Sequence, residues 1–164
     1  MDIRRAEISD FDQIWAILHE TFLKGDTYTF SPDTSKVEAF HLWMASPLAT
    51  YVAIVNKQIV GTYFIKPNQP GFGAHVCNAG YVVSLNARGK GLGRLMCEHS
   101  LNVAREFGFK AMQYNFVVST NHVAIELWKK CGFEIVGTLH NAFKHPGKGF
   151  VDAYVMYQWF TSSR

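Results

Sequence analysis

The fold is decided by residues 81–107, which read YVVSLNARGKGLGRLMCEHSLNVAREF. Its opening residues Tyr81, Val82, Val83 and Leu85 form a short apolar, β-branched run, which is typical of a strand. From Leu92 onward, apolar residues recur at helical spacing as far as Phe107, and Gly108 follows as a stop signal. The stretch therefore predicts a strand that turns directly into a helix.

The turn between the two, residues 88–94, reads RGKGLGR. A glycine-rich turn that enters a helix points several backbone N–H groups at one spot, and the helix dipole adds partial positive charge there. Three cations flank the turn, namely Arg88, Lys90 and Arg94. A phosphate-bearing ligand fits these features, although neither the nucleotide-triphosphate loop GxxxxGK[ST] nor the dinucleotide fingerprint GxGxxG matches. The alternative is an ordinary basic turn whose glycines serve only its geometry.

Composition bounds the class of protein. The chain has 164 residues, of which 48% are hydrophobic and 18% charged, so we expect one globular domain over residues 1–164. No apolar run approaches the roughly 20 residues that span a bilayer, and the N-terminus lacks the apolar region of a signal peptide. We therefore expect a soluble cytoplasmic protein without a membrane partner. The net charge of +3 is modest, which favours an anionic cofactor over nucleic acid.

Metal sites and disulfides are not expected. The three cysteines are an odd number at wide spacing, which fits buried apolar thiols better than a disulfide framework. The seven histidines are scattered, and none pairs with another at helical i+3 or i+4 spacing.

Hydrophobic periodicity predicts about seven strands and four helices, and hence an α/β domain. The first helix is expected between an N-cap at Ser9 and a stop at Gly25, and a capping box of Ser35 and Glu38 begins the second. The other two helices are expected at 91–107 and 121–131. Residues 140–149, HNAFKHPGKG, are expected to be a loop. The strands are predicted at residues 2–6, 50–55, 59–66, 76–85, 110–118, 133–139 and 151–160.

A second signature lies at residues 121–133, NHVAIELWKKCGF. It is similar to the pattern of Asn, then Ala, then Leu-Tyr-x-x-x-Gly-Phe in the GNAT acetyltransferase superfamily. The first turn contains that family's Arg-x-x-Gly-x-Gly as Arg88, Gly91 and Gly93. The chain resembles this family over nearly its whole length. The tail 136–158 and the loop 24–30 look most like the branch of phosphinothricin and amino-acid N-acetyltransferases.

The resemblance implies a mixed sheet that splays open between its fourth and fifth strands, with acetyl-CoA in the split. Val83 and Leu85 would offer backbone groups to the pantetheine arm, which Asn121 would also bind. Helix N-capping is the alternative role of Asn121, and packing is the main alternative for Trp128. The cofactor residues implied by the resemblance are Val83, Leu85, Arg88, Gly89, Lys90, Gly91, Leu92, Gly93, Arg94, Asn121 and Trp128.

The chemistry that the resemblance implies is direct attack of a neutral primary amine on the thioester, with the backbone N–H near Val83 as the oxyanion donor. Relatives often return a proton to the thiolate from a tyrosine, but this chain has Trp128 there, so Tyr114, Tyr81 or water would serve. Some relatives have a glutamate early in the strand before the glycine turn, but residues 74–80 contain no carboxylate here, which leaves His75 or ordered water as the base. Asp152 is a further candidate, because its carboxylate would anchor an ammonium group or a backbone N–H.

The acceptor is expected to be a small, amino-acid-like amine. Its pocket would be bordered by Tyr28, Phe30, His75 and the segment 143–148, which includes His145. Both histidines are also readily explained as surface or loop residues. Two other functions stay open, a CoA-binding module with little or no activity and an enzyme that acetylates a protein or peptide amine. The oligomeric state stays open too, a homodimer included.

Overall fold

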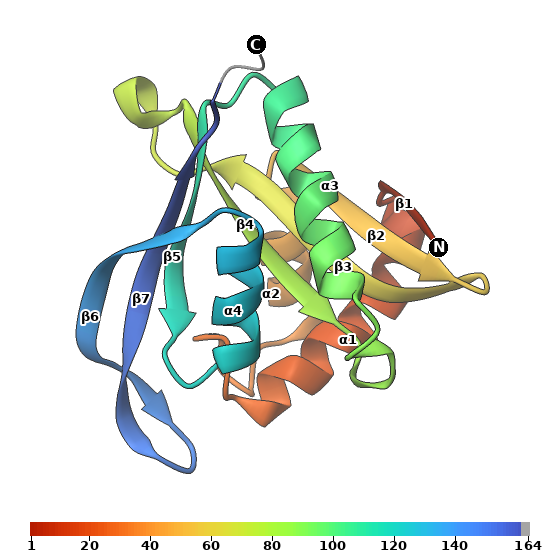
Figure 1. Ribbon diagram of the computed structural model, residues 1–164. Helices are drawn as coiled ribbons and strands as arrows, with labels where there is room; N and C mark the ends of the chain where they lie inside the picture. The colour runs from red at the N-terminus through yellow and green to blue at the C-terminus, as the bar shows by residue number, and fades with distance from the viewer. Residues whose placement is uncertain (162–164) are drawn as a thin grey trace.

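Within residues 1–161, seven strands form a mixed sheet in the order β1-β2-β3-β4-β5-β7-β6 (Figure 1). This computed structural model describes residues 1–161. All neighbouring strands are antiparallel except β4 and β5, which run parallel. The strands are β1 (Asp2–Arg5), β2 (Ala49–Val55), β3 (Gln58–Pro67), β4 (Val76–Val83), β5 (Ala111–Val118), β6 (Glu134–His145) and β7 (Gly149–Trp159).

Helices cover both faces of the sheet, as Figure 1 shows. The α-helices among residues 1–161 are α1 (Phe11–Lys24), α2 (Lys36–Phe40), α3 (Leu92–Glu106) and α4 (His122–Lys130). Apolar side chains of α1 and α2 pack with Phe64 and Val82 on one face. On the other face, α3 and α4 pack on β4 and β5 through residues such as Cys97, Ile125 and Met112. No helix among residues 1–161 is long and apolar enough to cross a membrane.

The sheet is split between β4 and β5. The two strands pair only at Val76 with Ala111 and at Cys77 with Met112. Beyond that point they diverge, while β4 stays paired with β3 as far as Val83. One edge of β4 is therefore open over most of its length. The predicted splay between the fourth and fifth strands is confirmed.

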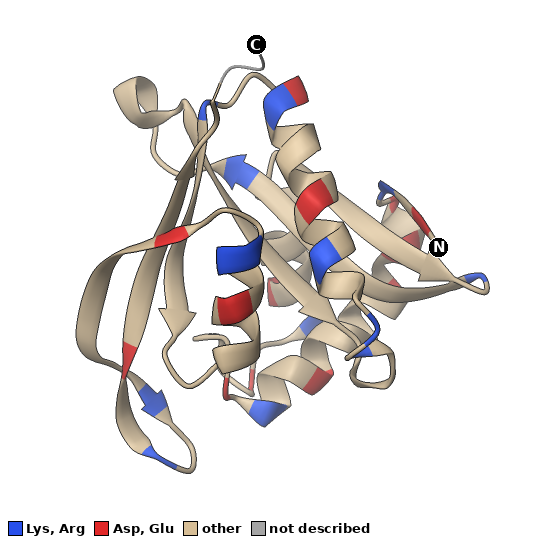
Figure 2. Cartoon of the chain, in the orientation of Figure 1, with Lys and Arg blue, Asp and Glu red and all other residues tan. Residues whose placement is uncertain are grey.

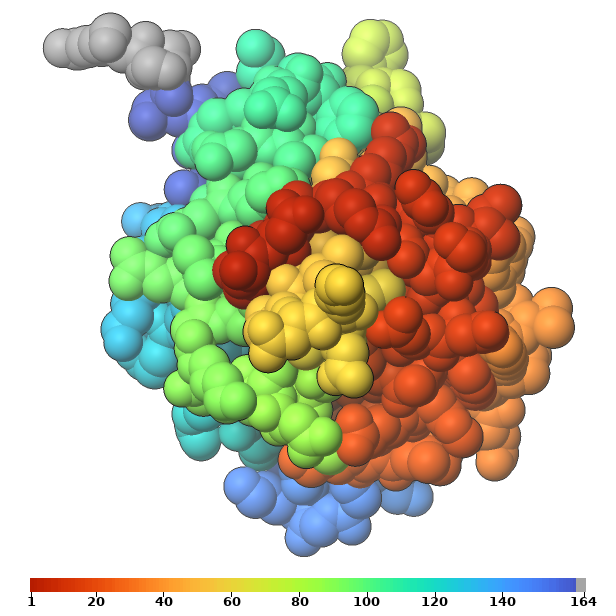
Figure 3. All heavy atoms as spheres, turned by 90° about the vertical axis from the view of Figure 1, so that its right-hand side faces the viewer, coloured from red at the N-terminus to blue at the C-terminus, as the bar shows by residue number. Residues whose placement is uncertain are grey.

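Turn chemistry explains the connections that the sequence predicted well. Asn56 and Lys57 have φ values of 50° and 64°, which suits a tight hairpin between β2 and β3. That hairpin emerges on the side of the molecule shown in Figure 3, between the red N-terminal segment and the green segment after β4. At α2, the Ser35 hydroxyl accepts from the Glu38 N–H and the Glu38 carboxylate accepts from the Ser35 N–H, which confirms the capping box.

The prediction of a loop at residues 140–149 was wrong. Strand β6 runs on to His145, and β7 begins at Gly149, so the two form a long hairpin. A bulge explains the error, because the register shifts between Leu139 and Phe143 and Asn141 has a φ of 53°. The bulge interrupts the alternation of side chains by which a strand is recognised.

The predicted N-cap of α1 was also wrong. A 3₁₀ turn (Ile8–Asp10) precedes the helix, so Ser9 lies inside the first turn. Asp10 holds the N-cap position of α1 without a side-chain cap bond to that helix, and its carboxylate instead closes the capping box of the 3₁₀ turn by accepting from the backbone N–H of Glu7 at 2.7 Å. The guanidinium of Arg4 holds that carboxylate in place, at 2.8 and 3.0 Å.

Candidate active site

The open edge of β4 presents backbone hydrogen-bonding groups to the split. The N–H of Tyr81 donates to the Tyr28 hydroxyl at 2.8 Å, and that hydroxyl donates to the Tyr81 carbonyl at 2.9 Å. The groups of Tyr81 therefore point away from β3, and strand alternation gives Val83 the same direction. The Val83 carbonyl accepts from Arg88 Nε at 3.4 Å. Leu85 follows in an exposed 3₁₀ turn at the end of this edge.

The glycine turn lies where this edge ends. Gly89 and Gly91 have φ values of 76° and 78°, in the left-handed region that side chains disfavour, and α3 begins directly afterwards. The first turn of α3 has no acidic residue. Arg88 and Lys90 are exposed, while Arg94 forms an ion pair with Glu98 at 2.8 Å, and basic residues mark this corner in Figure 2. The turn can therefore hold an anion with both backbone and side-chain groups.

Two further residues of the first turn of α3 pack against the protein. Leu92 is buried beside Met96. Gly93 lies close to α4, since a Cβ there would come 3.0 Å from Leu127 Cδ2. This close approach joins the glycine turn to the second signature.

Helix α4 stands beside the split. Asn121 is its N-cap and accepts from the Ala124 N–H at 3.3 Å, while its amide nitrogen donates to no other residue among 1–161. The ring of Trp128 lies 5.0 Å from that of Tyr81 and 4.9 Å from that of Tyr114. Because these tyrosines belong to β4 and β5, Trp128 contacts both walls of the split on the α3 face.

Tyr114 belongs to a buried chain of hydroxyl groups under Trp128. Its hydroxyl donates to the Tyr81 hydroxyl at 3.0 Å and lies 3.7 Å from Cys97 Sγ. The Tyr81 hydroxyl in turn contacts Ser100 Oγ. Burial raises the pKa of both phenols well above the ordinary value, so both are neutral. Tyr114 is 5% exposed and is held by protein groups.

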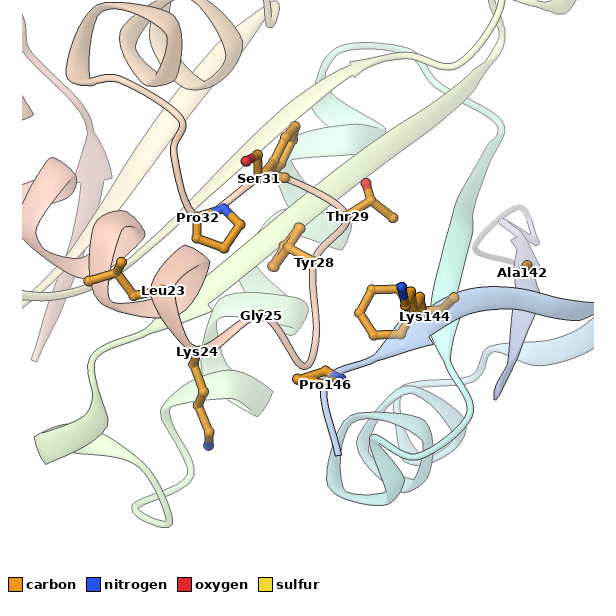
Figure 4. A pocket seen from close by; sticks show the side chains of 12 residues that line it. Leu23, Lys24, Gly25, Tyr28, Thr29, Ser31, Pro32, Ala142, Lys144 and Pro146 are labelled. Atoms are coloured by element: carbon orange, nitrogen blue, oxygen red, sulfur yellow. The ribbon is translucent and has the colours of Figure 1, made fainter. Parts of the chain in front are cut away.

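A cleft of about 460 Å³ opens on the opposite face of the sheet. Its lining residues come from 23–32, which are the last residues of α1 and the segment after it, and from 142–146, in the β6–β7 hairpin. Figure 4 shows Tyr28 and Pro32 on the first segment, with Lys144 and Pro146 across from them. The charged lining residues are Lys24 and Lys144, and no described Asp or Glu lines the cleft. Such a cleft suits a small molecule with an apolar body and a negative group.

The structure brings together only part of the predicted acceptor site. Tyr28, Phe30 and residues of 143–148 line the cleft, but His145 does not, and its Nδ1 accepts from the Gly147 N–H at 3.0 Å. His75 is exposed beside Trp159, with 6.2 Å between ring centroids. It precedes the paired residues of β4 and so lies beyond the closed end of the split.

Asp152 supports the β6 bulge. Its carboxylate accepts from the Asn141 N–H at 2.9 Å and lies 3.7 Å from His140 Nδ1. This contact satisfies a backbone group that the bulge leaves without a strand partner.

Sequence reasoning did not identify a group of amides at the closed end of the split. Asn78 Nδ2 donates to the Gln113 carbonyl at 2.9 Å, bridging β4 and β5. Gln113 Nε2 donates to Asn115 Oδ1 at 2.9 Å, and Asn115 Nδ2 donates to Asn68 Oδ1 at 2.7 Å. The sequence feature that could have indicated this group is the alternation of polar and apolar residues on β4 and β5. Because alternate side chains of a strand point to opposite faces, this alternation places the polar residues on the face of α1 and α2.

Comparisons with known proteins agree with this architecture. The model of the acetyltransferase (GNAT) family matches residues 11–133. The N-acetyltransferase aca1 of Schizosaccharomyces pombe is 38% identical over 119 residues, which are 72% of this chain and 57% of that protein. The chain thus spans little more than half of this curated relative's length.

Two solved structures are similar over almost the whole chain. A GCN5-related N-acetyltransferase from Kribbella flavida is 38% identical, with a TM-score of 0.93 and 97% of each chain covered. A phosphinothricin acetyltransferase from Sinorhizobium meliloti, solved in complex with acetyl-CoA, shares the fold at 21% identity, with a TM-score of 0.84 over 97% of this chain and 88% of that one. The chain belongs to the GNAT acetyltransferase family.

Proposed function

We propose that this chain is an N-acetyltransferase that moves the acetyl group of acetyl-CoA to the primary amine of a small molecule with an anionic group, such as an amino acid. One observation carries the proposal. The open edge of β4 joins the glycine turn to the cleft, because Tyr28 both bonds to that edge and lines the cleft. A cofactor and an acceptor would therefore meet at β4.

The features of acetyl-CoA fit the groups around the split. Its pantetheine arm has amides that can pair with the backbone of Val83 and Leu85, as a peptide pairs with a sheet edge. The turn 88–94 would hold the pyrophosphate, and the amide nitrogen of Asn121 is available to the arm. Trp128 would pack against the cofactor from the α3 face. The cofactor supplies an activated acetyl group.

The acceptor proposal rests on the charge of the cleft. Lys24 and Lys144 line it, and Lys24 is already paired with Asp26 at 3.4 Å. Lys144 is exposed and is therefore the better partner for an acceptor carboxylate. A cationic acceptor such as a polyamine is disfavoured, because no described carboxylate lines the cleft.

The reaction needs little acid–base help from the protein. The amine nitrogen forms a bond to the acetyl carbon, the carbon–sulfur bond breaks, CoA leaves as a thiolate, and the nitrogen loses a proton. We propose that water accepts this proton, since His75 lies beyond the closed end of the split and Asp152 is engaged at the bulge. A thiol with a pKa of about 8.5 leaves readily, so water can also protonate the thiolate in place of Tyr114.

The test is a panel of amines with acetyl-CoA, in which release of free CoA thiol is measured. Each amino acid is paired with its methyl ester and with the amine that lacks the carboxyl group. We expect turnover of at least one amino acid, with kcat/KM about tenfold or more above that of its uncharged partners, the value of one modest charge contact.

Three results would contradict the proposal in different ways. Binding of acetyl-CoA without turnover of any amine would indicate a CoA-binding module. Turnover of peptide N-termini or lysine side chains in preference to free amino acids would indicate a protein acceptor. Equal turnover of an amino acid and its ester would contradict the anionic acceptor alone.

A further inference from the structure

The hydroxyl of Tyr28 occupies an unusual place on the open edge of β4. It accepts from the Tyr81 N–H at 2.8 Å and donates to the Tyr81 carbonyl at 2.9 Å, so one side chain satisfies both groups of one peptide residue. In a closed sheet those groups would pair with the neighbouring strand. Tyr28 comes from the connection between α1 and α2, which also lines the cleft (Figure 4).

The local packing is built around this contact. A Cβ at Gly80 would come 3.2 Å from the Tyr28 hydroxyl and 2.7 Å from Phe64 Cε1, so the lack of a side chain there makes room for both. The Tyr28 ring lies 5.8 Å from that of Phe30 and 6.1 Å from that of Trp43. Burial raises the pKa of the Tyr28 phenol, so it is neutral and keeps its proton.

The position matters for any extended ligand in the split. Such a ligand would pair with Val83 and, two residues deeper, would meet Tyr81. The N–H of Tyr81 is already bonded to Tyr28, so the donor that can turn toward the ligand is the phenol O–H. The end of the ligand that reaches Tyr81 would be the end farthest from the glycine turn, which in acetyl-CoA is the acetyl group.

We propose that the Tyr28 hydroxyl donates a hydrogen bond to the thioester carbonyl oxygen of acetyl-CoA, while the same hydroxyl oxygen continues to accept from the Tyr81 N–H. This inference rests on the proposed function. The phenol O–H leaves the Tyr81 carbonyl and turns to the ligand, while the bond from the Tyr81 N–H keeps the oxygen in place and polarises the O–H. The proton stays on the phenol throughout. The donor stabilises the negative charge that develops on the oxygen when the amine attacks.

A binding experiment tests the contact without turnover. S-ethyl-CoA has a CH₂ group in place of the thioester carbonyl of acetyl-CoA, and calorimetry gives the dissociation constant of each. In the wild-type protein we expect acetyl-CoA to bind more tightly, and in Tyr28→Phe we expect this preference to fall by about three- to tenfold, the value of one neutral hydrogen bond. An unchanged preference would overturn the inference.

A kinetic experiment tests the role in the reaction. Tyr28→Phe should lower kcat by about 100- to 1000-fold, as loss of one preorganised donor does, with the affinity for CoA within a few-fold of wild type. Tyr51→Phe is the control, since Tyr51 stacks on Tyr63 and its hydroxyl bonds to no residue among 1–161. It should leave kcat unchanged. Melting temperatures show whether both variants are folded.

The two proposals fail separately. If the wild-type protein neither binds acetyl-CoA nor acetylates an amine, the proposed function is wrong. If the wild type does both and Tyr28→Phe keeps the kcat of the wild type, the inference is overturned. An unchanged kcat, with or without a gain in cofactor affinity, would show that Tyr28 only satisfies the open edge of β4 when no cofactor is bound.

Discussion

The two halves of the candidate site are built in different ways. The half proposed for the cofactor is local, because the turn 88–94 brings glycines, cations and a helix N-terminus together within one short segment. The half proposed for the acceptor is assembled from 23–32 and 142–146, which are far apart in the chain. A function that depends on one segment can be inferred from its spacing. A cleft between distant segments depends on how the whole sheet is arranged.

The largest expected effect falls on the local half. Gly91→Asp adds a side chain at a φ of 78° and a negative charge in the turn. We expect the affinity for acetyl-CoA to fall about 100-fold or more, so that the cofactor no longer raises the melting temperature at a concentration that stabilises the wild type.

Gly71→Asp is the matched control for backbone strain. Gly71 has a φ of 57° and open space around a Cβ, but it lies in the 3₁₀ turn before β4. Its variant should lose stability without losing the thermal shift. If a folded Gly91→Asp protein kept the full shift, the turn would not be the phosphate site.

A smaller effect is expected in the assembled half. Lys144→Met keeps the length of the side chain but removes the charge from the cleft. We expect the KM of an anionic acceptor to rise about tenfold, with the dissociation constant of acetyl-CoA unchanged, because one exposed charge contact is lost. Lys148→Met, in the hairpin turn outside the cleft lining, should behave like wild type. A parallel loss of acetyl-CoA affinity in Lys144→Met would show that the two halves were assigned wrongly.

The start of α1 supports the assembled half, since this helix leads into residues 23–32. The hydrogen bonds from Arg4 hold the pKa of Asp10 below its usual range. Asp10→Asn should therefore lower the free energy of unfolding at pH 7 by about 1–2 kcal/mol. This value is kept small because the Arg4 side chain is 39% exposed, and solvent weakens its interaction with Asp10. Urea unfolding measures this loss.

The pH dependence of that loss follows from the sign of the shift. A carboxylate with a depressed pKa stabilises the fold above its unfolded pKa of about 4, and this stabilisation disappears as the pH falls through the folded value. The difference between wild type and Asp10→Asn should thus be constant near pH 7 and shrink below about pH 4. Asp12→Asn is the control, because Asp12 is 84% exposed in its pair with Lys36. A difference that grew at low pH would contradict the role of Asp10.

The sequence was a good guide where structure depends on neighbours in the chain. Asn56-Lys57 and the box of Ser35 and Glu38 are local devices, and both are confirmed. It was a poor guide where the local structure depends on a residue that is distant in the chain. The bulge at Asn141 needs the carboxylate of Asp152 from the next strand, and the Asp10 carboxylate in the 3₁₀ turn before α1 is held by Arg4 from β1. Likewise, no local pattern indicates that the Tyr28 hydroxyl bonds to Tyr81.

The smallest effect is expected at Trp128, which lies against both walls of the split on the α3 face. Its ring contacts Tyr81 and Tyr114 on both walls of the split, and its indole N–H donates to no residue among 1–161. Packing therefore explains its position, and Trp128→Phe keeps an aromatic ring against both tyrosines. We expect kcat within about threefold of wild type, whereas loss of a true general acid typically costs about 100- to 10,000-fold. Trp128→Ala should instead lower stability or cofactor affinity, because it leaves a cavity between the walls. A 100-fold or greater loss of kcat in Trp128→Phe, with acetyl-CoA binding intact, would show that the indole N–H takes part in the chemistry, since ring packing and cofactor affinity would both have been preserved.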